Sequence, residues 1–546
     1  MNIIAIIPAR GGSKKIIRKN IKLLNEKPLI YYTINNAKTT GLFNEIVVTS
    51  DSDEILNIAN NYGISTLKRS EELSGDDVTL DPVVCDALIK CERKNKIRYD
   101  VVVTLQPTSP LLSIDTLKDA IRKYLLDEEN DTYISVVNKP HLAWSYNGNK
   151  YIPFYKERLN RQKLPPYFIE TGGFLISKRD NVLEYSRMGK TVYVYPVPEN
   201  EAIDIDDMND WLLCEAQLRK KKIVLRADAY KELGTGHIYR IITLCLAMAE
   251  HETIAVLNKT YQMGIDMIKN IGIDYHLIET DDDFLFFLND TKPDIVIIDC
   301  LNTTVDYITK LKNIVPKVVV FEDEGEGANY ADIIINALYE NGTSEKNKYF
   351  GAKYCCLRDE FYNKIPKPFS CSVNNIFVSF GGSDPSDITS KVYIIACSLI
   401  EKYHDLKFNF VVGLGFKSER KKDIIPVPDK INIIYDTPHI SEYMSKADLA
   451  IISGGGTIFE ICSMGIPAIV LFQNLRETSH KFAQIHNGFI SLGYGSVADS
   501  KTINDTIEWL MNAPGIRKEM QDIMLSIDLR NGTRRVKNII LGDFYE

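Results

Sequence analysis

Short apolar runs alternate with amphipathic stretches along the whole chain. The first four apolar runs are rich in Ile and Val and cover residues 3–7, 45–50, 100–105 and 133–137. Between them, residues 28–38 and 113–126 carry apolar positions at helical spacing. Strands that are apolar on both faces and separated by helices predict a parallel sheet with helices on both sides.

The same pattern starts again twice further along the chain. A helical segment ends near residue 221, where a new apolar strand begins, and a third series starts at residues 374–384. We therefore predict an α/β domain over residues 1–221, followed by two α/β domains, over 222–370 and 371–546, that share a cleft. The helical residues after 490 are expected to pack back across that cleft.

The composition is typical of several globular domains and disfavours two kinds of binding partner. Of 546 residues, 45% are hydrophobic and 25% are charged. A net charge of −8 disfavours nucleic acid and acidic membranes as partners, and no run approaches the roughly 18 apolar residues that span a bilayer. The ten cysteines lack metal-binding spacing and indicate buried thiols in a reducing compartment. We expect a cytoplasmic protein.

A basic, glycine-rich loop, PARGGSKKIIRKN, follows the first apolar run. Gly11 and Gly12 let the backbone approach a phosphate, whose oxygens backbone N–H groups can bind. The loop adds five cations, Arg10, Lys14, Lys15, Arg18 and Lys19. The alternative is a solvated basic turn that only caps the sheet.

Paired acids stand far downstream, in EAIDIDDMNDW at residues 201–211. Asp204 and Asp206 project from one face of an extended segment and make an oxygen site suited to Mg²⁺, whereas Asp207 is placed to cap the next helix. Exposed acids before a helix are the alternative interpretation. Cations for a triphosphate and carboxylates for its metal together predict attack on the α-phosphate of a nucleotide, with pyrophosphate leaving.

Residues 1–220 resemble the acylneuraminate cytidylyltransferases, the CMP-sialic acid synthetase family. The resemblance rests on PARGGSKxxxxKN, LQPTSPL (105–111), GGFLI (172–176) and AIDID (202–206). It implies a Rossmann-like nucleotidyltransferase domain in which the anomeric hydroxyl of a nonulosonic acid, a nine-carbon 2-keto sugar acid, attacks the α-phosphate of CTP. Such enzymes are commonly dimeric, so the resemblance implies a homodimer through this domain.

The resemblance also assigns residues. Lys19 is implied to stabilise charge that develops on the α-phosphate, and Asp204 and Asp206 match the metal carboxylates. The implied nucleotide positions are Arg10, Gly11, Gly12, Lys14, Asn20 and Arg69. The implied sugar positions are Gln106, Arg161, Thr171 and Gly172.

Two residues depart from the sialic acid pattern. Ile169 and Thr171 stand where those enzymes usually have Arg and Asn, which implies an altered sugar pocket. A deoxygenated relative such as legionaminic acid then fits at least as well as N-acetylneuraminate, while Arg161 can still pair with the sugar carboxylate.

A second glycine-rich turn, RADAYKELGTGHIYR, follows the first strand of the second domain. His237 lies at a helix start, where the dipole favours anions and keeps the imidazole neutral, able to act as a base. In ISGGGTIFEICSMGIP (452–467), Glu460 lies one turn into its helix, where a carboxylate can accept both ribose hydroxyls of a nucleotide. A structural histidine and a solvent-facing glutamate are the alternatives.

Residues 222–490 resemble the GT-B fold, and in particular the pseudaminic acid pathway hydrolases that remove UDP from a 2,4-diacetamido trideoxyhexose. The motifs are RADAxxxxGTGHxxR, LRDEF (357–361), SFGGSD (379–384) and GGGTxxE. The resemblance implies that His237 activates water at the anomeric carbon of a UDP-linked sugar. The implied nucleotide positions are Gly381, Gly382, Gly455, Gly456, Thr457 and Glu460, and Asn474 is a further substrate position.

Together the two resemblances predict a bifunctional enzyme of nonulosonic acid biosynthesis. Its hydrolase supplies a free hexose, a separate synthase condenses the hexose with phosphoenolpyruvate, and the cytidylyltransferase activates the product. The first domain looks closer to sialic and legionaminic acid enzymes than to pseudaminate ones. For the second half a glycosyltransferase, or a noncatalytic module that binds a nucleotide sugar, stays open.

Overall fold

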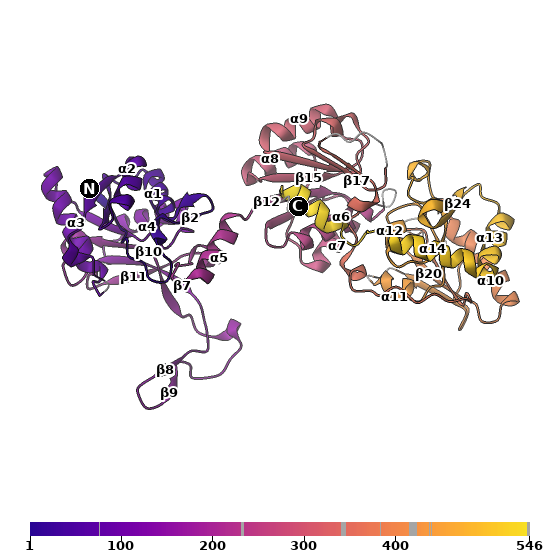
Figure 1. Cartoon of the computed structure of the whole chain (residues 1–546), viewed down its shortest axis with the longest axis horizontal. Helices are drawn as coiled ribbons and strands as arrows, with labels where there is room; N and C mark the ends of the chain where they lie inside the picture. Colours follow the sequence, from indigo (N-terminus) through magenta and orange to yellow (C-terminus); the bar gives the residue numbers. More distant parts are fainter. Residues whose placement is uncertain are drawn as a thin grey trace. The chain divides into compact units, whose positions relative to one another are not determined.

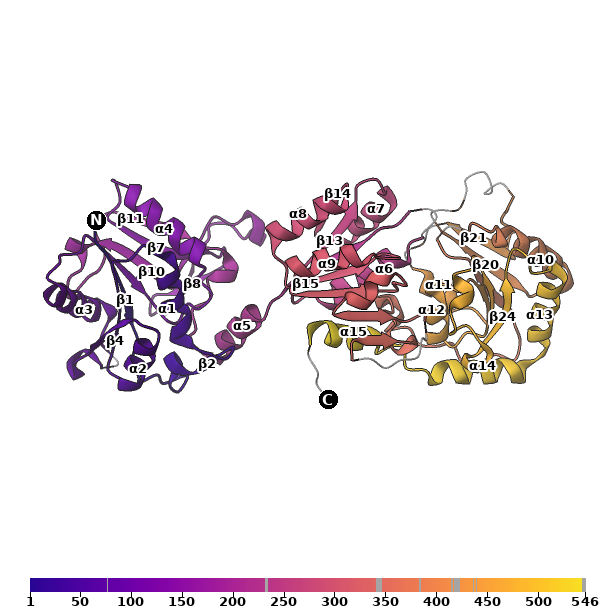
Figure 2. The ribbon, with the colours of Figure 1, turned by 90° about the horizontal axis from the view of Figure 1, so that it is seen from above.

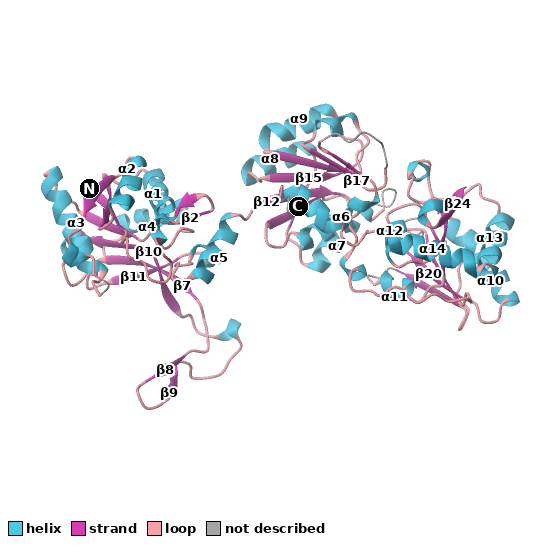
Figure 3. Ribbon diagram, in the orientation of Figure 1, coloured by secondary structure: helices cyan, strands magenta, loops and turns pink. Residues whose placement is uncertain are grey.

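The computed structural model describes residues 1–75, 77–230, 234–339, 346–382, 384–413, 416, 423–435, 437 and 439–542. The chain divides into two compact units, Met1–Lys220 and Lys221–Glu546 (Figure 1). In both units helices and strands alternate along the chain (Figure 3). Among the described residues, no helix has the length and apolar character needed to cross a membrane.

One sheet forms the centre of the first unit, with the strand order β11-β7-β10-β6-β1-β4-β5. In chain order its strands are β1 (Ile3–Pro8), β4 (Glu45–Ser50), β5 (Ser65–Lys68), β6 (Val101–Leu105), β7 (Thr132–Asn138), β10 (Phe168–Lys178) and β11 (Val192–Pro196). The helices are α1 (Leu29–Thr40), α2 (Asp53–Asn61), α3 (Leu80–Asn95), α4 (Ile114–Leu126) and α5 (Met208–Leu218).

Both faces of this sheet are buried, as successive residues of β1 show. Ala5 and Ile7 belong to the core formed with α1 and α4, whereas Ile4 and Ile6 pack with α3. Figure 2 shows these three helices around the strands of the sheet. Because side chains alternate across a strand, helices on both faces require an apolar residue at every position. The loops after β1, β4 and β6 then lie at one edge of the sheet, since these strands are parallel.

The expectation of a wholly parallel sheet is wrong for β10. This strand runs antiparallel to both of its neighbours, β6 and β7. Between β7 and β10 the chain leaves the sheet and makes an excursion over residues 139–167. This excursion contains a hairpin of β8 (Trp144–Tyr146) and β9 (Tyr151–Pro153) (Figure 1). These residues, all described, hold no α-helix that could return the chain to the opposite edge, so β10 starts where β7 ended and runs back.

Two parallel sheets form the second unit. The first has the order β14-β13-β12-β15-β16-β17-β18, and the second has the order β21-β20-β19-β22-β23-β24. The strands of the first are β12 (Lys222–Ala227), β13 (Glu252–Asn258), β14 (Tyr275–Ile278), β15 (Ile295–Asp299), β16 (Lys317–Phe321), β17 (Ile333–Asn336) and β18 (Lys348–Phe350). Those of the second are β19 (Asn375–Ser379), β20 (Lys407–Val412), β21 (Ile431–Tyr435), β22 (Leu449–Ile452), β23 (Ala468–Phe472) and β24 (Phe489–Tyr494).

Helices cover both sheets of this unit. The first half contains α6 (Gly236–Ala247), α7 (Gln262–Ile271), α8 (Asp281–Thr291) and α9 (Val305–Ile314). The second contains α10 (Ile388–Lys402), α11 (Ile440–Met444), α12 (Thr457–Ser463), α13 (Ser500–Asn512) and α14 (Pro514–Ser526). Two such halves joined by a crossover form the GT-B arrangement that the sequence predicts.

The last helix, α15 (Gly532–Leu541), returns to the first half, as expected for the helical C-terminal segment. Val536 and Ile540 belong to the same core as Ile223 of β12. At the carboxyl end of α15, the Nζ atoms of Lys221 and Lys317 donate to the carbonyls of Leu541 and Ile540, at 2.9 and 3.1 Å. These contacts place cations where the helix leaves carbonyl groups without helical partners.

Candidate active sites

Distant motifs of the first unit meet at the backbone of Ile205. Its N–H donates to the carbonyl of Thr108, in the LQPTSPL turn, at 2.8 Å. Its own carbonyl accepts a hydrogen bond from Nζ of Lys19 at 2.6 Å. The Ile205 side chain is fully buried, and the carboxylates of Asp204 and Asp206 on either side both act electrostatically on Lys19. The basic loop and the paired acids therefore share one site.

Burial controls the ionisation of this site. Burial lowers the pKa of Lys19, and Asp206 and Asp204 partly oppose that shift. Arg10 and Lys15 lower it further. Burial also raises the pKa of Asp204, whereas the side chain of Asp206 is exposed. Charges taken out of water in this way interact strongly with an incoming charged ligand.

The basic loop is tied to the sheet by its own polar groups. The N–H of Gly11 donates to Oδ1 of Asp51 at 2.8 Å, and Nδ2 of buried Asn20 donates to the carbonyl of Arg10 at 2.8 Å. A Cβ on Gly11 would lie 3.0 Å from that of Ser52, so a glycine lets the loop pass this close to its neighbour. Arg10, Gly12 and Lys14 are exposed on the same loop. Sequence reasoning missed Asp51, although it stands directly after a buried strand.

Arg69 places a buried cation beside this loop. It follows β5, is 8% exposed, and donates from Nη2 to the carbonyl of Thr49 at 2.9 Å. Burial lowers its pKa, Asp51 opposes the shift, and Arg10 adds to it. Its Nε has no hydrogen-bond partner among the described residues. A buried N–H without a partner is costly, so an anionic ligand at this point would stabilise the site.

Gly172 brings the middle of the sheet against the acidic segment. It adopts φ +68°, and an added Cβ would lie 3.0 Å from Oδ2 of Asp204 and 3.3 Å from Nε2 of Gln106. Both the backbone conformation and the space therefore require glycine here. Gln106 and Asp204 consequently converge on one point, where the sequence places sugar and metal positions.

The other two predicted sugar residues, Thr171 and Arg161, make other contacts. Thr171 is 3% exposed, and its hydroxyl donates to Oγ of Ser135 at 2.9 Å within the sheet. Its side chain thus holds β10 to β7 instead of facing the site. Arg161 lies on the excursion over residues 139–167, where its side chain is 61% exposed and lies 3.7 Å from Glu199.

The acidic pair has the chemistry of a magnesium site. Oδ1 of Asp204 is buried and has no hydrogen-bond partner among the described residues, while Asp206 offers exposed oxygens. Within the described part of the chain, no group of three His, Cys, Asp or Glu residues could hold a metal ion. Mg²⁺ suits a site of this kind because it binds through one or two carboxylates and completes its shell with water and substrate phosphate.

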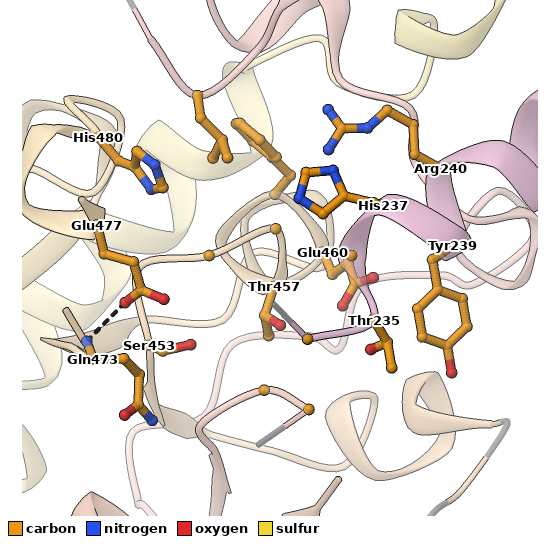
Figure 4. Close-up of a pocket in the computed structure, with 18 of the residues that line it drawn as sticks. Thr235, His237, Tyr239, Arg240, Ser453, Thr457, Glu460, Gln473, Glu477 and His480 are labelled. Atoms are coloured by element: carbon orange, nitrogen blue, oxygen red, sulfur yellow. Dashed lines mark hydrogen bonds between the residues drawn. The ribbon is translucent and has the colours of Figure 1, made fainter. Parts of the chain in front are cut away.

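A cavity of about 720 Å³ lies between the two halves of the second unit (Figure 4). The glycine-rich turns of the two halves meet at one side of it. A Cβ on Gly382 would lie 3.3 Å from Oγ1 of Thr235, and Gly381 adopts φ +75°. A side chain at residue 382 would press on Thr235, so glycine at this position lets the two loops approach this closely.

His237 points into this cavity from the first turn of α6, as the sequence predicts (Figure 4). Its Nδ1 lies 2.7 Å from Oδ1 of Asp299, at the end of β15. Arg240 contacts the same carboxylate from its Nε at 3.0 Å and reaches Oε1 of Glu322 from Nη1 at 3.0 Å. The prediction that the helix dipole sets the charge of His237 omitted these two acids.

The glycine-rich loop of the second half is held by the side chains of Glu477, which accepts hydrogen bonds, and His480, which donates one. Oε2 of Glu477 accepts from the backbone N–H groups of Gly454 and Gln473 at 3.1 and 2.8 Å, and burial raises the pKa of Glu477. Nδ1 of His480 lies 2.8 Å from the carbonyl of Gly454, and burial lowers its pKa. Gly455, Gly456, Thr457 and Asn474 line the cavity beside this loop.

Glu460 lines the same cavity but is not solvent-facing. Its side chain is 13% exposed, and Oε1 accepts a hydrogen bond from Nε of Arg358 at 2.7 Å. One of the two carboxylate oxygens that the sequence assigns to ribose therefore already accepts a hydrogen bond from Arg358. Arg358 was missed as an individual residue, although it belongs to the LRDEF motif.

Comparison with known proteins separates the two units. The sequence model of a family described as Cytidylyltransferase matches residues 4–195, and that of the Glycosyltransferase family 28 C-terminal domain matches residues 375–483. Pseudaminic acid cytidylyltransferase of Campylobacter jejuni is 34% identical over 217 residues, which are 38% of this chain and 93% of that protein. The chain belongs to the cytidylyltransferase family through its first unit.

Two further proteins are similar to this chain. CMP-N,N'-diacetyllegionaminic acid synthase of Legionella pneumophila is 34% identical over 225 residues, 39% of this chain and 95% of that protein. An uncharacterized protein of Methanocaldococcus jannaschii is 33% identical over 273 residues, 46% of this chain and 56% of that protein. The pseudaminic acid relative and the legionaminic acid relative are both 34% identical to this chain. These identities therefore do not show the expected greater likeness to legionaminic acid enzymes.

We expect Arg69→Met to weaken binding of CTP about 10- to 100-fold, since it removes a buried charged donor worth about 1.5–3 kcal/mol. Isothermal titration calorimetry with CTP measures the change. Lys68→Met is the matched control, because Lys68 is an exposed cation one residue earlier that pairs with Asp53 at 2.6 Å. An equal loss of affinity in both variants would contradict the assignment.

Proposed function

We propose that the protein is a bifunctional enzyme of nonulosonic acid biosynthesis. Its first unit transfers CMP from CTP to a nonulosonic acid and releases pyrophosphate. Its second unit hydrolyses a UDP-linked diacetamido trideoxyhexose. The contact of Lys19 with the backbone between Asp204 and Asp206 carries the first assignment, because it joins the cations and the acids at one place.

In the first reaction, the sugar's anomeric oxygen forms a bond to the α-phosphorus of CTP as the bond to the leaving pyrophosphate breaks. Lys19 lies where charge develops on the α-phosphate, and Arg69 and the loop cations bind the triphosphate. Asp204 and Asp206 would hold Mg²⁺, which supplies charge neutralisation on the phosphates. Gln106 lies next to Gly172 and Asp204, where it can orient the sugar.

The names of the relatives support the substrate class. The Campylobacter protein is named for pseudaminic acid and the Legionella protein for diacetyllegionaminic acid. Both names specify nonulosonic acids joined to a cytidylyl group, and the chain spans nearly the full length of each. We therefore propose a nonulosonic acid of this kind as the acceptor of CMP.

In the second reaction, His237 acts as a general base. With Nδ1 bonded to Asp299, Nε2 is the nitrogen available to take a proton from water. The water oxygen forms a bond to the anomeric carbon, and the bond from that carbon to the diphosphate oxygen breaks. Asp299 keeps the ring in the required tautomer and stabilises the imidazolium that forms.

A glycosyltransferase is the second candidate for this unit, because the matched family model at residues 375–483 is described as a glycosyltransferase domain. The same base and cavity would then activate an acceptor hydroxyl instead of water. The third candidate, a noncatalytic module that binds a nucleotide sugar, would need the glycine loops but not the His237–Asp299 pair.

Asp206→Asn is expected to lower pyrophosphate release with CTP, Mg²⁺ and a nonulosonic acid by about 100-fold or more, because a carboxylate ligand to the metal is lost. A coupled phosphate assay measures the rate. Asp207→Asn is the matched control: Asp207 caps α5, and asparagine caps equally well. The assignment fails if both variants keep the wild-type rate.

His237→Ala is expected to lower release of UDP from the UDP-linked hexose by about 10²- to 10⁴-fold, the usual contribution of a general base. Pyrophosphate release by the first unit should stay within about twofold of wild type, since His237 belongs to the second unit. Chromatographic assay of UDP measures the first rate.

Controls separate the three candidates for the second unit. His276→Ala should behave as wild type, because His276 lies on β14, stacks on Phe287 and does not line the cavity. Wild-type UDP release that requires an acceptor sugar would favour the glycosyltransferase. Tight binding of the UDP-sugar without any release would favour the binding module.

We propose that the first unit forms a homodimer through the β8–β9 hairpin. Trp144, Tyr146, Tyr151 and Phe154 are 53%, 60%, 71% and 64% exposed on this excursion. Exposed aromatic clusters of this kind mark protein interfaces. Analytical ultracentrifugation should give the mass of two chains for wild type and of one for Tyr151→Glu. Phe286→Glu, at an equally exposed phenylalanine on α8, should remain dimeric. A monomeric wild type would refute the proposal.

A further inference from the structure

Arg358 connects two residues of the cavity in the second unit. It directly precedes a short 3-10 turn at Asp359–Phe361 and is the arginine of the LRDEF motif, which has no part in the reaction above. Its Nε donates to Oε1 of Glu460 at 2.7 Å. Its Cζ lies 4.6 Å from the centroid of the Tyr239 ring, within the range of a cation–π contact.

These two contacts belong to different halves of the unit. Leu357 and Phe361, on either side of Arg358, are part of the core formed by β22 and β23 of the second half, and Glu460 lies on α12 of that half. Tyr239 lies on α6 of the first half, two residues after His237 and next to Arg240. Arg358 is thus anchored beside the nucleotide loop and touches the helix that carries the proposed base. All of these side chains line the cavity except that of Phe361.

The charges around Arg358 show why it matters to Glu460. Nη1 also lies 3.1 Å from Oε1 of Glu360, so one guanidinium faces two carboxylates that are 17% and 13% exposed. Burial raises the pKa of Glu460, and Arg358 opposes that shift. Glu360 is held on its other side by the backbone N–H of Ser441 at 3.1 Å. Removing Arg358 would leave two poorly solvated carboxylates without their common cation.

We infer that Arg358 is a positioning residue that couples recognition of the ribose to the placement of His237. By bonding one oxygen of Glu460 it holds that side chain in place and directs the other oxygen to the ribose hydroxyls. By stacking on Tyr239 it fixes the first turns of α6 relative to the bound nucleotide. The inference rests on the proposed function in one respect, namely that a UDP-sugar occupies this cavity with its ribose at Glu460.

A comparison of UDP with 2′-deoxy-UDP tests the inference. Wild-type protein should bind UDP about 10- to 100-fold more tightly, the value of a hydrogen bond to a charged group. In Arg358→Met this preference should fall below about threefold, and the maximal rate of UDP release from the UDP-linked hexose should fall by at least about tenfold, because the base is misplaced. Calorimetry gives the affinities and steady-state kinetics gives the rate.

Arg358→Lys keeps the charge but lacks the planar fork. Arg358→Lys should retain part of the preference for UDP over 2′-deoxy-UDP. Its maximal rate of UDP release should recover to a smaller extent than this preference. This variant also supplies the test should Arg358→Met fail to fold. If Arg358 were merely structural, its replacement would lower the melting temperature without changing the ratio of the affinities for UDP and 2′-deoxy-UDP.

Arg535→Met is the matched control, since Arg535 pairs with Asp528 in the same unit and does not line the cavity. It should leave both the preference and the rate unchanged. Folded Arg358 variants that keep the wild-type preference and rate would overturn this inference while leaving the hydrolase intact. Wild-type protein that binds no UDP would overturn the inference and the proposed function together.

Discussion

The hydrogen bond from Lys19 to the carbonyl of Ile205 is the contact on which the first active site depends. It joins residues 186 positions apart in the chain and brings the glycine-rich loop to the acidic segment. The N–H of the same isoleucine is held by Thr108, so its backbone is fixed from both sides. Because the Ile205 side chain is buried, the neighbouring carboxylates are directed toward the lysine. A parallel sheet makes this meeting possible, since the loops after β1 and β6 leave the same edge.

In the second unit, too, the ends of parallel strands bring charged residues together, but here these residues are acids. Asp299 and Glu322 stand at or just after the ends of adjacent parallel strands, β15 and β16, and both are buried. One arginine, Arg240, faces both carboxylates, and His237 contacts that of Asp299, so the imidazole lies beside a buried cluster of charged groups. Buried charges in this number persist only when they are paired or serve a reaction that needs them. The network therefore does more than hold α6 in place.

The sequence indicated the repeating elements and much of the site chemistry, because these follow from local patterns. Apolar runs gave the strands, and Asp207 caps α5 as predicted, with a reciprocal bond from Asp210. Local patterns could not show that β10 runs antiparallel, since its direction depends on where the excursion rejoins the sheet. They also could not pair Glu460 with Arg358 or His237 with Asp299, because these partners lie 102 and 62 residues apart. An acid directly after an apolar strand was the available signal for Asp299 and for Asp51.

The groups that surround the proposed reacting atoms differ between the two sites, and this agrees with the chemistry proposed for each. Transfer of a nucleotidyl group develops negative charge on a phosphate, which a surplus of lysine and arginine around the first sheet edge would stabilise. Removal of a proton from water by an imidazole develops positive charge on the ring, which the carboxylate of Asp299 would stabilise. A nucleotide is an anion in both cases, and in the second unit Arg240, Arg358 and Arg476 line the cavity proposed to hold it. Gly381, Gly382, Gly455 and Gly456 line the same cavity, where their backbone N–H groups would bind phosphate while adding no net charge next to the base.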